Sequence, residues 1–147
     1  MSHHEWYDVV YGIELPSNNP DNDKILAFID NHKEVFAWFT DENYYPVDHD
    51  SLNEFLYDYE DDMGNTGIGV LIADVVGDMF INVANDQYGD EFVGMYATTM
   101  FPWHHNGMGG NWKSITPEYI ESKVRPVVEE LYGVCPDFKE HTIWNNG

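Results

Sequence analysis

The stretch GIGVLIADVVGDMFINVAN, residues 67–85, decides the predicted fold because its apolar residues recur at helical spacing. Residues three or four positions apart are apolar throughout it: Ile68, Leu71, Ile72, Val75, Val76, Met79, Phe80 and Val83. This repeat predicts an amphipathic helix of about five turns, buried along one side. Its glycines and β-branched residues lower its intrinsic helix propensity, so packing at the centre of the protein must hold it.

Two further helices are predicted before this stretch. Asn22 or Asp23 can cap the first helix, and residues 35–39 fit either its continuation or a short strand. The second covers residues 51–61, where Ser51 and Glu54 have the spacing of a capping box.

A fourth helix is predicted after it. Thr116, Pro117 and Glu118 provide a cap, a proline and an acid in the order typical of a helix start, and Gly133 suits its end. Pro126 inside this helix removes a backbone hydrogen bond, so we expect a kink or break near Arg125.

Three segments read as strands because they are rich in aromatic and β-branched residues: 6–15, 91–101 and 138–144. The predicted order is β-α-α-α-β-α-β. We therefore expect an α+β fold in one domain, residues 1–147. It has a small, mostly antiparallel sheet of about three to four strands, with about four helices packed on it.

The charge is strongly acidic and unevenly placed. The chain of 147 residues has 27 Asp and Glu against 6 Lys and Arg, a formal net charge of −21. Residues 34–112 contain no lysine or arginine. Direct binding to nucleic acid or to an anionic membrane needs clustered cations, so we expect this protein to bind neither directly.

The compartment is expected to be the cytoplasm. No apolar run approaches the ~18–20 residues of a membrane helix, and the first residues lack the basic and apolar regions of a signal peptide. The lone Cys135 excludes an internal disulfide and any multi-cysteine metal site. We expect that thiol to be inert and partly buried.

The acidic residues form the candidate binding face. On the helix at 51–61, Glu54 and Asp58 lie at i and i+4, followed by Asp61 or Asp62. On the long helix, Asp74 and Asp78 continue with Asn82 at the same spacing, opposite the apolar stripe. A basic protein surface is the expected partner, and imitation of nucleic acid is one version of this hypothesis. One helical stripe carries a charge per ~6 Å, against one per ~1.7 Å in duplex DNA, so several elements must contribute acids.

Catalytic chemistry has little support in the sequence. The pair His104 and His105, in a glycine-rich loop between Trp103 and Trp112, is the weak candidate for metal binding or general-base work, with carboxylates from elsewhere. The acidic run from Asp58 to Asp62 lacks the residue order of a calcium-binding EF-hand loop. No phosphate-binding loop or nucleophile-elbow motif occurs, and no cofactor is expected.

The leading hypothesis is therefore a non-enzymatic protein-binding accessory protein. Its size and charge are similar to those of small accessory and inhibitor proteins of phages and mobile elements, an analogy of composition alone. The alternatives are a metal-assisted hydrolase using His104 and His105, and a structural or oligomeric protein whose exposed aromatic residues form an interface.

Overall fold

The computed structural model describes residues 5–43, 47–96, 101, 103 and 115–146. It confirms the α+β fold. Four strands form one antiparallel sheet in the order β2-β3-β1-β4. Their bounds are β1 Glu5–Glu14, β2 Asn82–Asn85, β3 Glu91–Tyr96 and β4 Lys139–Asn146. Five helices accompany the sheet: α1 Asn22–Asn31, α2 Lys33–Asn43, α3 Leu52–Asp58, α4 Ile68–Val76 and α5 Pro117–Tyr132.

The predicted five-turn helix over 67–85 was wrong in its second half. The helix α4 ends at Val76 because Gly77 takes a left-handed conformation, with φ of 67°, and its N–H donates to the carbonyl of Ala73. The chain then turns and enters β2. Met79 belonged to the predicted apolar stripe, yet 83% of its surface is exposed. Ile81, which lay outside that stripe, is buried instead.

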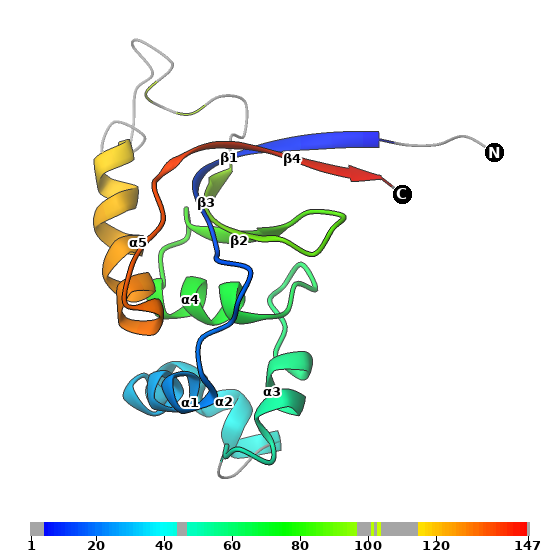
Figure 1. Cartoon of the computed structure of the whole chain (residues 1–147), viewed down its shortest axis with the longest axis vertical. Helices are drawn as coiled ribbons and strands as arrows, with labels where there is room; N and C mark the ends of the chain where they lie inside the picture. Colours follow the sequence, from blue (N-terminus) through cyan, green and yellow to red (C-terminus); the bar gives the residue numbers. More distant parts are fainter. Residues whose placement is uncertain (1–4, 44–46, 97–100, 102, 104–114, 147) are drawn as a thin grey trace, which may run out of the picture.

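Helix α4 lies below the sheet and α5 beside it, and α1, α2 and α3 form a lower tier (Figure 1). Helices α4 and α5 contact the strands, and α1, α2 and α3 lie beyond α4 on the side away from the sheet. Residues 35–39 are part of α2, which settles the helix-or-strand alternative. An aromatic core joins the lower tier; its members include Phe28, Phe36, Phe55 and Tyr59.

The sheet curls strongly (Figure 1), and two glycines oppose each other across β1 and β3. Gly12 pairs with Gly94, and a Cβ atom built on Gly12 would lie 2.0 Å from the carbonyl oxygen of Val93. The curl brings the turn after β2 to the opposite edge strand, where the Gln87 N–H donates to the carbonyl of Trp144 at 3.3 Å. It also encloses a second, smaller core made of Val10, Ala84, Phe92 and Ile143.

The helix ends test the predicted caps. The Thr116 hydroxyl accepts from the Tyr119 N–H at 3.1 Å, which confirms the start of α5. Gly133 ends that helix in a left-handed conformation, as predicted. The chain stays helical through Pro126, so the helix does not break there.

The capping box before α3 was wrong. The Ser51 side chain makes no cap hydrogen bond to α3. It accepts instead from the N–H of Asp48, at 3.0 Å. In the part of the chain that the structure describes, no helix is both long and apolar enough to cross a bilayer.

Candidate protein-binding surface

The acidic residues singled out in the sequence fall into two groups. Glu54 and Asp58 lie exposed on α3, and Asp61 and Asp62 follow in the turn after it. The charges of both carboxylates in that turn help to raise the pKa of the Asp74 carboxyl on α4, after the larger effect of burial. The predicted stripe of Asp74, Asp78 and Asn82 was wrong, because α4 ends before Asp78 and Asn82 lies on β2.

Asp74 anchors the end of α3 to α4. The Tyr59 hydroxyl donates to its Oδ2 at 2.6 Å, and the Tyr59 ring is buried against Phe36 and Phe55. Burial raises the pKa of the Asp74 carboxyl above its ordinary value, while the bond from Tyr59 lowers it. Burial and the bond to Asp74 both raise the pKa of Tyr59. One carboxylate oxygen of Asp74 is therefore used for a hydrogen bond within the protein.

Asp78 makes a similar contact on the other side of α4. It accepts a hydrogen bond from the hydroxyl of Tyr119, on the first turn of α5. That bond is the largest cause of the raised pKa of Tyr119. Asp78 thus joins α4 to α5.

The Asp61 carboxylate organises the turn between α3 and α4. Its Oδ1 accepts from the N–H groups of Met63 and Asn65, at 2.9 and 2.8 Å, and its Oδ2 accepts from the Asn65 side chain at 3.0 Å. Among the described residues, no group of three or more His, Cys, Asp or Glu side chains is arranged to hold a metal ion.

What remains on the α3 side is an exposed acidic surface that contains large apolar side chains. Tyr57 and Met63 have 79% and 84% of their surfaces exposed. We call this surface the α3 face; it comprises Glu54, Tyr57, Asp58, Glu60, Asp62 and Met63, all exposed. Neither Tyr57 nor Met63 was predicted from the sequence, although Tyr57 directly precedes Asp58 in the predicted helix.

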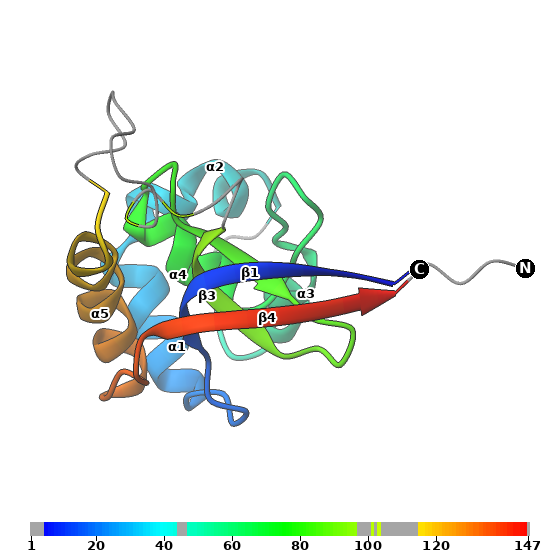
Figure 2. The same cartoon turned by 90° about the horizontal axis from the view of Figure 1, so that it is seen from above.

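Two of the chain's six cations are on helix α5, beside four acids. Helix α5, which carries Lys123 and Arg125, lies on the opposite side of the molecule from α3 (Figures 1 and 2). The Lys123 ammonium lies 5.6 Å from the ring centre of Tyr119, and the Arg125 guanidinium 5.2 Å from that of Phe138. The α3 face belongs to the segment 34–112, which contains no lysine or arginine.

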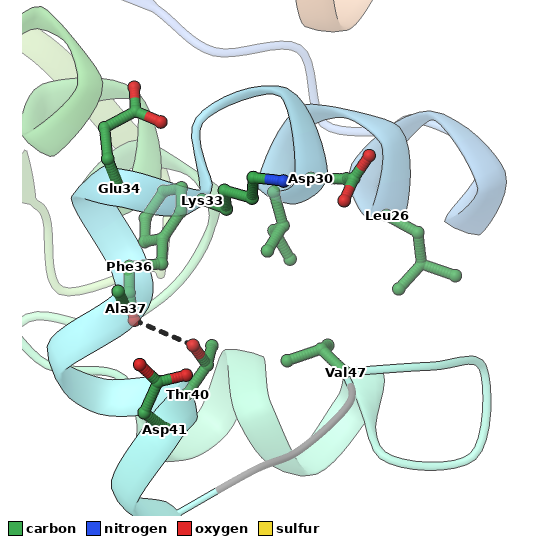
Figure 3. A pocket seen from close by; sticks show the side chains of 10 residues that line it. Leu26, Asp30, Lys33, Glu34, Phe36, Ala37, Thr40, Asp41 and Val47 are labelled. Carbon is green, nitrogen blue, oxygen red and sulfur yellow. Dashed lines mark hydrogen bonds between the residues drawn. The ribbon is translucent and has the colours of Figure 1, made fainter.

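A hollow of about 590 Å³ lies between α1, α2 and Val47 (Figure 3). We call it the α1–α2 hollow. Its apolar lining consists of Leu26, Ile29, Phe36, Ala37 and Val47, and its polar lining of Asp30, Lys33, Glu34, Thr40 and Asp41. This hollow was not predictable from the sequence, since it depends on the angle between two helices.

The remaining candidates are two histidines and a thiol. His104 and His105 lie outside the described residues, so the metal site predicted there stays a prediction. Cys135 is half-buried, burial raises the pKa of its thiol, and its sulfur donates to the carbonyl of Pro136 at 3.4 Å. A raised thiol pKa leaves little reactive thiolate at neutral pH. Compared with known proteins, the chain matches no family, no curated sequence and no solved structure.

Proposed function

We propose that this protein binds a basic protein through the α3 face and has no catalytic role of its own. The observation that carries the proposal is the exposure of Tyr57 and Met63 among carboxylates. Aromatic and methionine side chains are enriched at protein interfaces, where they supply much of the binding energy. A surrounding ring of carboxylates selects a partner of opposite charge and speeds the encounter.

The sequence supports the sign of that charge. Residues 34–112, which include α3 and the turn after it, contain no lysine or arginine. At a formal net charge of −21, the protein repels anionic partners and attracts basic ones over a distance set by the salt concentration.

Capture experiments with matched variants test the proposal. The bait variant Glu54→Gln, Asp58→Asn, Asp62→Asn neutralises three acids of the α3 face. The control variant Asp90→Asn, Glu129→Gln, Asp137→Asn neutralises three exposed acids elsewhere, so both baits change the net charge equally. The wild type and the control should capture a basic protein at low salt and release it at high salt, while the α3-face variant captures little. Equal capture by the two variants would contradict the proposal.

Three finer statements belong to the same proposal. The partner's basic surface is one that binds nucleic acid, and the acids of α3 and of the turn after it together imitate phosphates from two elements. The protein acts in the cytoplasm, in keeping with its single free thiol. It serves as an accessory or inhibitor protein of the kind that phages and mobile elements encode. Competition between the captured partner's nucleic acid and this protein tests the imitation.

A second candidate function, self-association, is favoured by the part of the β1–β4 strand pair that extends beyond β3. Strand β3 pairs with β1 from Val10 onward, so residues 5–9 pair only with β4 among the described strands. There the rings of Tyr7 and Trp144 lie 5.0 Å apart, with 59% and 52% of their surfaces exposed. Light scattering separates a monomer from an oligomer.

The metal-assisted hydrolase is tested by metal analysis of the purified protein beside the variant His105→Ala. Stoichiometric zinc or manganese that is lost in the variant would favour the hydrolase over the binding protein.

A further inference from the structure

We infer that the α1–α2 hollow receives a large apolar side chain from a basic amphipathic helix of the partner. The inference rests on the proposed function for the partner's charge, but it concerns a different surface from the α3 face. Helices commonly bind by placing an apolar side chain in a groove of this kind.

The walls of the hollow are apolar and come from separate elements. Helices α1 and α2 are joined by His32 alone, so their axes diverge and leave a gap between Ile29 and Ala37. Val47 closes the gap from the third side (Figure 3). Nearby, His49 bonds to Asp23 of α1 at 2.8 Å, which ties the segment with Val47 to the first helix.

The size of the hollow suits a large side chain. Its volume of about 590 Å³ falls within the range of about 300–1,000 Å³ that is typical of ligand sites. Its lining is polar only toward the rim, and the Thr40 hydroxyl there is already bonded to the carbonyl of Phe36 at 3.1 Å. The interior thus offers apolar contact and few hydrogen bonds, which favours a hydrocarbon or aromatic group.

The rim selects a cationic partner. Three exposed carboxylates, those of Asp30, Glu34 and Asp41, surround the opening with one lysine, Lys33. The local charge is therefore negative. Lysine and arginine place their apolar stems along a surface and their charges at its edge. A helix with one apolar side and flanking cations matches both the interior and the rim.

Fluorescence anisotropy with a labelled 16-residue peptide of leucine and lysine, patterned as an amphipathic helix, tests this inference. The comparison peptide keeps every lysine and replaces each leucine with serine. We expect the leucine-lysine peptide to bind about tenfold or more tightly, because only it offers an apolar group for burial. Equal affinities would overturn the inference.

Variants locate the binding. Ala37→Phe fills the hollow without changing charge, and should weaken the leucine-lysine peptide by about tenfold while leaving the lysine-serine peptide unchanged. The rim variant Asp30→Asn, Glu34→Gln, Asp41→Asn should weaken it more than Asp90→Asn, Glu129→Gln, Asp137→Asn does. An unchanged affinity of the leucine-lysine peptide for Ala37→Phe would overturn the inference. It would also be overturned if octanol displaced the peptide while the rim variant had no effect, because the hollow would then be a site for small neutral molecules.

Amide chemical shifts of the wild type keep the test valid if Ala37→Phe fails to fold. The peptide should shift amides of α1 and α2 most strongly, and shifts confined to α3 would overturn the inference. Failure here is distinguishable from failure of the proposed function, because capture of the basic partner is judged with the α3-face variant alone.

Discussion

Replacement of Tyr59 by phenylalanine isolates the hydrogen bond that joins the end of α3 to α4. The tyrosine ring is buried against Phe36 and Phe55, and phenylalanine keeps those contacts. Only the hydroxyl that donates to Asp74 Oδ2 at 2.6 Å is lost. The half-buried carboxylate of Asp74 then loses this donor.

The size of the effect follows from the charge on the acceptor. A hydrogen bond to a charged group contributes about 1.5–3 kcal/mol, against about 0.5–1.5 kcal/mol for one between neutral groups. Because Asp74 is partly open to water, we expect a loss near the lower end of the charged range, about 1.5 kcal/mol at pH 7.

The loss should depend on pH in a direction set by Asp74. Burial raises the pKa of this carboxyl in the folded state, so its ionisation costs stability as the pH rises through that folded pKa. The bond from Tyr59 opposes the rise in pKa. Without the hydroxyl the folded pKa rises further, so the destabilisation by Tyr59→Phe grows from acidic to neutral pH.

Urea denaturation of both proteins at several pH values measures this difference. Tyr119→Phe is the matched control, because it removes the corresponding hydrogen bond to Asp78. Burial raises the pKa of Tyr119 less than that hydrogen bond does. Tyr119→Phe should therefore lower the free energy of unfolding less than Tyr59→Phe does. A pH-independent loss, or a larger loss in the control, would refute the reasoning.

Three further changes test the fold and the thiol. Gly12→Ala should lower the free energy of unfolding by more than about 3 kcal/mol, since its Cβ would meet a backbone carbonyl at 2.0 Å. Gly89 has a φ of 87° but open space around it, so Gly89→Ala should cost only about 1–2 kcal/mol. Equal losses for the two variants in urea denaturation would contradict the close approach at Gly12. Glu91→Ala should lower the stability by about 1–3 kcal/mol in thermal denaturation. It removes the carboxylate oxygen that accepts from the Gly69 N–H at 2.9 Å, at the start of α4. Unchanged amide exchange at Gly69 would contradict this role of Glu91. Burial raises the pKa of the Cys135 thiol. At pH 8 the thiol should therefore react several-fold more slowly with a disulfide reagent in the folded protein than in urea. Equal rates would show that the thiol is accessible to solvent in the folded protein.

The sequence predicts the elements whose ends carry a local signal. Thr116 and Gly133 mark α5 by a side-chain cap and a left-handed glycine, and both depend only on neighbouring residues. The long pattern at 67–85 misleads because apolar residues three or four apart also arise where a helix and a strand meet. Gly77 ends α4 in the structure, but a glycine inside an apolar run does not by itself say whether the helix continues.

The candidate surface was predictable in part. The acids of α3 were identified from their spacing, and they are exposed as expected. The bonds of Asp74 to Tyr59 and of Asp78 to Tyr119 were not, because each joins residues from different helices. The hollow beside Ala37 also depends on how α1 and α2 cross, which no local pattern records.

The binding role of the α3 face is tested by the affinity of the captured basic partner for two variants of equal charge. Exposed charge pairs contribute about 0.2–1 kcal/mol each, so Glu54→Gln, Asp58→Asn, Asp62→Asn should raise the dissociation constant about tenfold at low salt. Asp90→Asn, Glu129→Gln, Asp137→Asn should leave it within about twofold of the wild type, and high salt should remove the difference between the variants. Equal dissociation constants for the two variants at low salt would contradict a binding role for the α3 face.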